Sequence, residues 1–183
     1  ENYPVLGDSG RALCEVETQS TRPDAQYHPL VESDDFSEWN PEQKRLFGTF
    51  GWKSCWQFNH EPELSWIEND AEKGCLRMVC RKQCKNVTQA VNTITQRMKF
   101  PVCITEVTVD AEGIKDGDYA GMCALQGCYG MAAVTKRDGQ MLLVMRSLEE
   151  EHDSIEGNQG NSEEIEWEAV AVESSKIRIR MEA

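Results

Sequence analysis

Apolar and polar residues alternate with a period of two along several short segments, and this pattern constrains the fold more than any other feature of the sequence. The clearest case lies near the C-terminal end, where Ile177, Ile179 and Met181 alternate with charged residues. Similar rows occur at Leu76, Met78 and Cys80, at Asn92, Ile94 and Gln96, at Thr105, Val107 and Val109, and at Ile165 and Trp167. Successive side chains of a strand point to opposite faces of a sheet, so these rows predict β-strands with one buried face.

Turn signals separate these segments. Asp138-Gly139 lies between residues 131–136 and 141–145, which is a β-hairpin signature. No useful stretch has the helical period, and no internal repeat is present. Many short strands joined by turns predict an all-β fold, and specifically a two-layer antiparallel β-sandwich.

The length of 183 residues suits one good-sized domain. Proline and glycine punctuate the first thirty residues, which show little periodicity. We therefore expect an irregular linker over residues 1–32 and a sandwich over residues 33–183. No apolar run is long enough to span a membrane, and the first residues show no signal-peptide pattern.

The formal net charge is −13, and acidic residues concentrate after residue 148. Such a chain repels a phosphate backbone, so neither nucleic acid nor an anionic membrane is an expected partner. A neutral polysaccharide is indifferent to this charge.

The chain has 8 cysteines and no C-x-x-C pair, so the strongest zinc and thioredoxin signals are absent. Several cysteines occupy positions predicted to face inward, where a thiol behaves as a small hydrophobe. This usage favours reduced thiols and a cytoplasmic, bacterial location. A secreted protein with disulfides is the alternative, and a thiol or metal protein built on these cysteines is a further reading.

Several segments together resemble the C-terminal β-sandwich of glycoside hydrolase family 43, the β-xylosidases and α-L-arabinofuranosidases. The segments that carry the resemblance, in order, are WQFNHEP at 56–62, GCLR at 74–77, NTITQR at 92–97, KDGDYAG at 115–121, LQ at 125–126, YG at 129–130, and KRDG at 136–139. The family pattern is similar to WQWNHNP, GxLRL, NTLTQR and DGDxAGL. Residues 3–7, YPVLG, also resemble the end of the family's catalytic module.

The resemblance implies a concanavalin A-like jelly roll and a non-catalytic accessory role. In the family the sandwich packs on a five-bladed catalytic propeller, which carries three acidic residues and has no counterpart in this sequence. The family sandwich also continues past the strand that ends at Met181, so the resemblance implies a fragment, incomplete at its C-terminus. Such a fragment exposes unpaired edges and apolar surface unless another chain fills the gap.

The resemblance therefore implies an accessory domain of a hydrolase acting on xylan or arabinoxylan oligosaccharides. Catalysis by this chain is not expected, because glycoside hydrolysis needs two carboxylates flanking one bond, and the sequence singles out no such pair among 32 acidic residues. A free-standing carbohydrate-binding module for plant cell-wall polysaccharide is the alternative.

Carbohydrate sites combine flat aromatic faces with planar amide or charged groups. In WQFNHEP, Trp56, Phe58 and His60 share one face of a strand, whereas Gln57 and Asn59 lie on the other. We expect the aromatics to anchor the core and the polar residues before Pro62 to meet a sugar or another module. The candidate residues for substrate binding or domain contact are Gln57, Asn59, His60, Trp66, Arg97 and Tyr129.

The sequence predicts no cofactor and no metal as its first choice. Asp116-Gly117-Asp118 offers the oxygen ligands that calcium prefers. The same residues suit a tight turn, with Gly117 at positive φ, and we expect the turn. Asn86-Val87-Thr88 matches a glycosylation sequon, which matters only in a secreted eukaryotic protein.

Overall fold

The computed structural model of this chain describes residues 29–38, 51–99, 101–149 and 163–183. Most of the predicted linker, residues 1–28, lies outside these ranges, as do Cys14 and Trp39. The regular structure of the described residues is almost all strand, with two short 3-10 helices. None of their helices is long and apolar enough to cross a membrane.

The strands follow one another along the chain with short connections. Their bounds are β1 (Gln57–Phe58), β2 (Ile67–Asp70), β3 (Cys75–Met78), β4 (Ile94–Thr95), β5 (Ile104–Asp110), β6 (Tyr119–Gln126), β7 (Cys128–Arg137), β8 (Gln140–Leu148), β9 (Ile165–Ala171) and β10 (Lys176–Glu182). The 3-10 helices are η1 (Leu64–Trp66) and η2 (Val87–Gln89).

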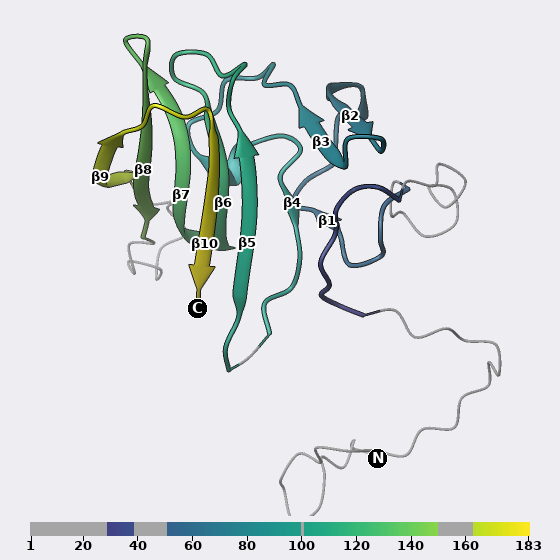
Figure 1. The fold of residues 1–183 in the computed structure, drawn as a ribbon. Helices are drawn as coiled ribbons and strands as arrows, with labels where there is room; N and C mark the ends of the chain where they lie inside the picture. Colours follow the sequence, from purple (N-terminus) through teal and green to yellow (C-terminus); the bar gives the residue numbers. More distant parts are fainter. Residues whose placement is uncertain (1–28, 39–50, 100, 150–162) are drawn as a thin grey trace, which may run out of the picture.

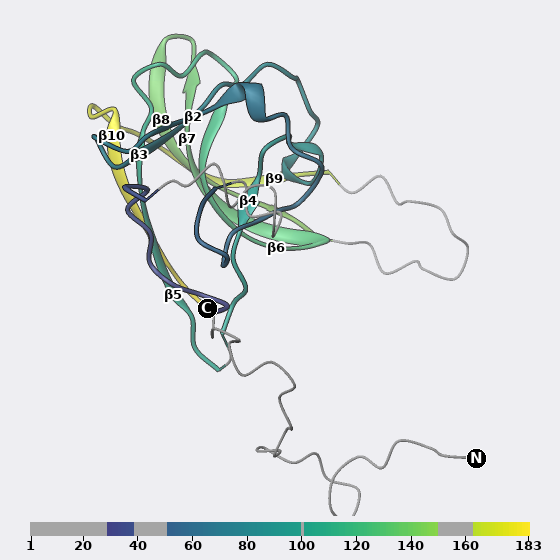
Figure 2. The ribbon, with the colours of Figure 1, turned by 90° about the vertical axis from the view of Figure 1, so that its right-hand side faces the viewer.

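Two antiparallel layers form the body of the domain. One is the sheet β6-β7-β8-β9, and the other is the pair β5-β10 (Figure 1). Figure 2 shows these layers side by side after a quarter turn. The Thr105 hydroxyl on β5 donates to Met122 Sδ on β6 at 3.2 Å, so the layers are in contact. The predicted two-layer antiparallel sandwich is confirmed.

The rows on β5 and β10 are confirmed as strands with one half-buried face. Val107 and Val109 on β5 pair with Ile179 and Ile177 on β10. Ile179 is only 6% exposed, whereas the charged residues between these positions are exposed. The alternation succeeds here because one face of this pair packs on the larger sheet.

The predicted hairpin at Asp138-Gly139 is also confirmed. β7 and β8 end at the pair Arg137 and Gln140, which leaves a two-residue loop. Asp138 has φ 52° and Gly139 has φ 79°, the left-handed values that a type I′ turn requires at both central positions.

The prediction of an inward row at Leu76, Met78 and Cys80 is wrong beyond its first residue. β3 ends at Met78, which is 40% exposed, and Cys80 is exposed in the following loop. β3 pairs only with β2, in a hairpin that stands beside the main layers (Figure 1). Without a layer against this end of the hairpin, alternation does not produce burial.

The other face of the larger sheet carries a small core. Tyr129, Met131 and Leu148 are buried together, with Val87 of η2 and Leu125 of β6 packed against them. Gly121 on β6 allows a close approach to β7, because a Cβ there would lie 2.2 Å from the carbonyl oxygen of Ala132. The end of this core, at Tyr129 and Leu148, borders the groove described next.

Candidate functional site

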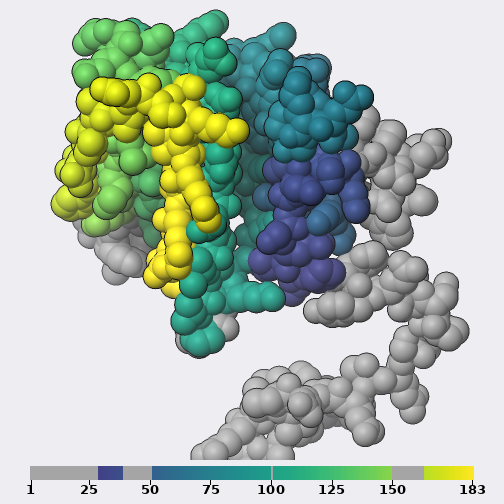
Figure 3. Space-filling view, viewed as in Figure 1, coloured from purple at the N-terminus to yellow at the C-terminus, as the bar shows by residue number. Residues whose placement is uncertain are grey.

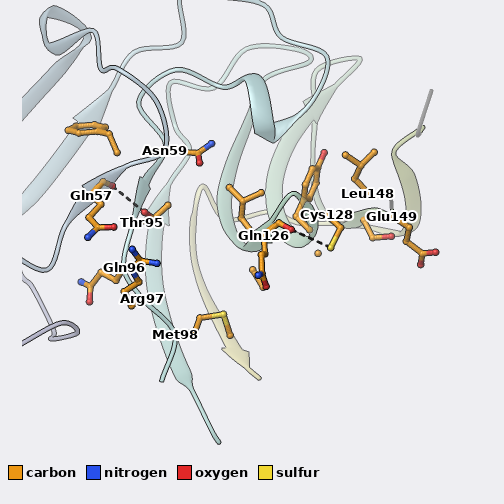
Figure 4. A pocket seen from close by; sticks show the side chains of 16 residues that line it. Gln57, Asn59, Thr95, Gln96, Arg97, Met98, Gln126, Cys128, Leu148 and Glu149 are labelled. Carbon is orange, nitrogen blue, oxygen red and sulfur yellow. Dashed lines mark hydrogen bonds between the residues drawn. The ribbon is translucent and has the colours of Figure 1, made fainter. Parts of the chain in front are cut away.

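An open groove of about 810 Å³ lies between the β1-β4 pair and the ends of β6, β7 and β8. Figure 4 shows Gln57, Asn59, Gln96 and Arg97 along one wall, with Gln126 and Cys128 across from them. Met98 extends from the same segment as Arg97 and also lines the groove. Five of the lining side chains carry an amide or a guanidinium, the planar groups that hydrogen-bond sugar hydroxyls or protein carboxylates.

Pairing of two short strands that are distant in the sequence builds the first wall. Gln57 pairs with Thr95 and Phe58 with Ile94 in the β1-β4 ladder. The Thr95 hydroxyl donates to the main-chain carbonyl of Gln57 at 3.3 Å, and the main-chain N–H of Asn59 donates to the main-chain carbonyl of Thr93 at 3.0 Å. The segments that resemble family 43, at 56–62 and 92–97, therefore lie side by side.

Two amide side chains hold distant main chain in place around this wall. Asn92 accepts from the Glu63 N–H at 2.9 Å and donates to the Glu63 carbonyl at 3.0 Å. Gln96 makes the same pair of bonds with Glu32, at 3.1 Å and 3.0 Å. Each side-chain amide bonds both the N–H and the carbonyl of one residue, as a paired strand would. The Gln96 side chain therefore has a structural role, and its amide is not available to a ligand.

Trp56 and Phe58 anchor the wall from behind. The Trp56 indole donates to Asp34 Oδ2 at 2.8 Å, and its ring stacks on Phe36 at 5.6 Å between centroids. Phe58 lies 5.7 Å from the ring of Trp52, which is 4% exposed. Trp56 and Phe58 are each half-buried, so they hold this wall against Trp52 and the segment 33–37 and do not belong to the buried core.

Tyr129 forms part of the opposite wall with its ring buried. It is 4% exposed, its hydroxyl donates to the Glu164 carboxylate, and the Val87 N–H donates to the Tyr129 hydroxyl at 3.5 Å. Burial and the bond to Glu164 raise the pKa of the Tyr129 phenol, which keeps it protonated. Its polar group is already committed, so the groove has no aromatic face to offer at this position.

Of the residues selected from the sequence, the structure brings Gln57, Asn59, Arg97 and Tyr129 to the groove. His60 and Trp66 do not line it. The strand that precedes His60 is only two residues long, so His60 lies in the following loop. Its imidazole hydrogen-bonds the Thr88 carbonyl. Trp66 ends η1, where its carbonyl accepts from the Val79 N–H at 2.9 Å.

Arg97 differs from most of the arginines that the structure describes. Arg77, Arg137, Arg146, Arg178 and Arg180 each form an ion pair with a carboxylate. Arg97 is exposed and makes no hydrogen bond or ion pair with any residue that the structure describes. An unpaired guanidinium in a groove of a chain with net charge −13 is available to an external carboxylate or hydroxyl.

Gln126 and Cys128 are groove residues that the sequence did not single out for binding. They pair with each other at the tight β6-β7 turn, where Gly127 has φ 79°. The Cys128 thiol lies 3.8 Å from the Gln126 carbonyl (Figure 4). A turn signal at Gly127 was visible, but nothing local in the sequence indicated that this turn faces residues 57–59.

The cysteines divide between the interior and the surface. Cys55 and Cys103 are buried outside the strands, whereas Cys80, the cysteine that the sequence placed in an inward row, is exposed, as is Cys128. Burial raises the pKa of the Cys55 and Cys123 thiols. The described cysteines are all free thiols, and the predicted location stays a prediction.

Asp116 and Asp118 both accept backbone hydrogen bonds. Asp116 accepts from the Gly139 N–H at 3.2 Å, and Asp118 Oδ2 accepts from the Lys115 N–H at 3.3 Å. Gly117 has φ 87°, as a tight turn at this position requires. No cluster of three acidic, cysteine or histidine ligands exists in the described ranges, so calcium at this turn stays a prediction without further support.

Comparison with known proteins identifies the domain. Residues 47–183 match the family described as the beta xylosidase C-terminal concanavalin A-like domain. Over 98% of its length the chain is similar to the solved structure of "Bifunctional GH43-CE" from Bacteroides eggerthii, with 31% sequence identity and a TM-score of 0.72. The chain spans 21% of that protein, and no curated protein matches it. The chain therefore belongs to the family of concanavalin A-like C-terminal domains of family 43 glycoside hydrolases.

Proposed function

We propose that this domain is the non-catalytic accessory sandwich of a family 43 hydrolase that acts on xylan or arabinoxylan oligosaccharides. In this proposal the domain packs on the catalytic propeller and shapes the entrance of its substrate pocket. One observation carries the proposal: the two segments most similar to the family, 56–62 and 92–97, converge on one wall of the groove. That wall presents Gln57 and Arg97, whose side-chain polar groups have no partner among the described residues.

The groove is not suited to glycoside hydrolysis by itself. That reaction needs two carboxyl groups on either side of one bond, roughly 5 to 10 Å apart. Among the described residues that line the groove, Glu149 alone carries a carboxylate. This supports an accessory role for the chain.

A free-standing carbohydrate-binding module is less well supported by the same lining. Such modules stack sugar rings on exposed aromatic faces, and each stacked aromatic contributes on the order of 1 kcal/mol. Of the aromatic residues that line the groove, Tyr129 is 4% exposed and Phe58 is half-buried, and none of the tryptophans that the structure describes lines it. An unpaired arginine beside exposed Met98 is typical of a protein interface instead.

The test uses the enzyme that carries this domain. We expect Arg97→Ala and Gln57→Ala to raise KM for xylooligosaccharides about fivefold, at unchanged melting temperature, because each removes a polar contact at the pocket entrance. Arg81→Ala is the matched control, since Arg81 is exposed but lies outside the groove.

Two outcomes would count against the proposal. An enzyme cut before Asp35 that keeps its turnover and stability on an aryl xyloside would show that the sandwich does not support the propeller. Calorimetric binding of xylohexaose by the 183-residue chain alone would favour the carbohydrate-binding module.

A further inference from the structure

A short segment ahead of the sandwich strands, residues 32–37, packs on the domain, and we call it the clamp segment. Its even-numbered residues Glu32, Asp34 and Phe36 are half-buried, and the residues between them are exposed. Phe36 has φ 56°, a value that few residues other than glycine adopt, and its N–H donates to the Asp34 carboxylate at 2.9 Å. Such a conformation persists only where the surrounding structure fixes it.

Two side chains bind the main chain at the start of the clamp segment. Gln96 accepts from the Glu32 N–H at 3.1 Å and donates to the Glu32 carbonyl at 3.0 Å. Lys53 donates to the Ser33 carbonyl at 2.8 Å, and its ammonium nitrogen lies 3.7 Å from the Glu32 carboxylate. Residues from two distant parts of the sequence therefore hold this end of the segment.

Trp56 and Asn69 bind the other end of the clamp segment. The Trp56 indole donates to Asp34 Oδ2 at 2.8 Å, and its ring stacks on Phe36. The Asn69 amide on β2 donates to the Phe36 carbonyl at 3.2 Å, and the indole of buried Trp52 holds Asn69 Oδ1 at 3.2 Å. Figure 3 shows the purple atoms of the segment directly beside the blue atoms of the β2-β3 hairpin.

The clamp segment binds both strands of the groove wall, which we define as residues 57–59 and 93–97. Trp56 directly precedes β1 and Gln96 directly follows β4, so both stand at the same end of this antiparallel pair. The ladder itself joins only two residues of each strand. Because an isolated two-stranded ladder is marginally stable at best, contacts outside the ladder decide whether the groove wall keeps its arrangement.

We propose that the clamp segment is a conformational device that couples the chain entering the domain to the groove wall. While residues 32–37 are seated, Trp56 and Gln96 hold the end of the β1-β4 ladder, and Arg97, the next residue, stays in the groove. When the segment leaves, both strands lose their shared partner and the groove wall opens with it. This proposal goes beyond the accessory function and does not depend on it, because every contact lies within the domain.

The test compares two neighbouring aspartates by hydrogen exchange of the 183-residue chain. Asp34→Ala removes the carboxylate that binds Trp56 and Phe36. We expect it to speed exchange of the clamp segment and of the groove wall together by about tenfold, as loss of one hydrogen bond to a charged group would. Asp35→Ala is the matched control, because the Asp35 carboxylate is exposed and accepts from its neighbour Ser37. It should leave the groove wall unchanged, and amides at the centre of β7 should exchange equally in every variant.

Two further variants keep the test valid if Asp34→Ala does not fold. Trp56→Phe keeps a ring on Phe36 and removes the indole N–H, so it should speed exchange of the same two regions by about threefold. Gln96→Ala removes both bonds to Glu32 and should speed exchange throughout the clamp segment, including the Phe36 N–H at its far end, because coupling between two sites is reciprocal. Gln83→Ala is its control, since Gln83 is exposed in the loop that follows β3.

Three results would overturn the proposal. The first is an unchanged groove wall in Asp34→Ala, whether or not the clamp segment exchanges faster. The second is the same acceleration of the groove wall in Asp34→Ala and Asp35→Ala. The third is an equal acceleration at the centre of β7, which would give Asp34 a role in global stability alone. None of these results bears on the kinetics of the enzyme, so failure here and failure of the accessory function are distinguishable.

Discussion

The two halves of the larger sheet have different surroundings. On the β6-β7 half, Val134 is fully enclosed by the second layer, whereas Val170, in the same cross-strand row on β9, is 49% exposed. Val134 stands in a run of apolar residues, 131–134, whereas Val170 follows the alternating residues Ile165 and Trp167. The difference shows that a local pattern can specify a strand, and that the opposite layer decides whether its apolar side is buried.

The largest expected effect lies in the covered half, at Gly121. A Cβ added there would meet the carbonyl oxygen of Ala132 at 2.2 Å and the Cα of Ala133 at 2.5 Å. Since both are main-chain atoms of β7 and cannot move aside without disturbing the ladder, we expect Gly121→Ala to lower the free energy of unfolding by about 3 kcal/mol. Gly130→Ala is the control, because nothing lies within 4 Å of its Cβ position. Equal urea midpoints for the two variants would contradict the close approach.

The second prediction compares the two valines directly. Val134→Ala should lower the free energy of unfolding by about 2 kcal/mol, because it leaves a cavity between two packed layers. Val170→Ala should change it by less than about 0.5 kcal/mol, since that side chain is half in solvent. Urea unfolding of both variants measures the difference. Similar losses at both sites would mean that the chain covers β9 as well.

The third prediction concerns the border between the core and the groove. Tyr129→Phe removes the hydroxyl that links Glu164 and the Val87 N–H while keeping the ring in place. We expect a loss of about 1 kcal/mol in the free energy of unfolding, because partners of a buried hydrogen bond are left unsatisfied. Thermal unfolding measures it, and an unchanged melting temperature would rule out a structural role for the hydroxyl.

The smallest expected effect is a pH dependence at the tie between β7 and β9. Arg137 makes two hydrogen bonds to Glu166 and lowers the pKa of that carboxyl below its ordinary value of 4.5. A depressed carboxyl pKa stabilises the folded state fully above the unfolded value, and this contribution is lost as the pH falls through the folded value. Arg137→Gln should therefore lose less stability than the unchanged chain between about pH 5 and pH 3. The measurement is the free energy of unfolding against pH, and parallel profiles for the two proteins would contradict a stabilising ion pair between Arg137 and Glu166.

The sequence predicted those parts of the fold whose causes are local. Asp138-Gly139 determines its hairpin because few residues adopt two successive left-handed conformations. β5 and β10 could be predicted because their apolar rows are regular. Their inward residues are buried because the larger sheet covers one face of the pair. Met78 and Cys80 were placed wrongly because the pattern does not reveal which strands lack a neighbour.

The candidate site was predictable in part. Gln57, Asn59 and Arg97 reach the groove because they flank the paired residues of β1 and β4. The amides of Asn92 and Gln96 bind main chain at Glu63 and Glu32, and neither bond has a signal in the local sequence. His60 does not line the groove, because β1 is only two residues long and ends before it. The length of a strand depends on its partner strand as much as on its own residues.

The most direct test of the account is hydrogen exchange of the domain, alone and within the enzyme that carries it. If the groove wall contacts the catalytic module, amides of residues 95–99 exchange more slowly in the enzyme than in the isolated chain, while those at the centre of β7 exchange equally in both. Identical exchange over residues 95–99 in the two samples would contradict the proposed contact.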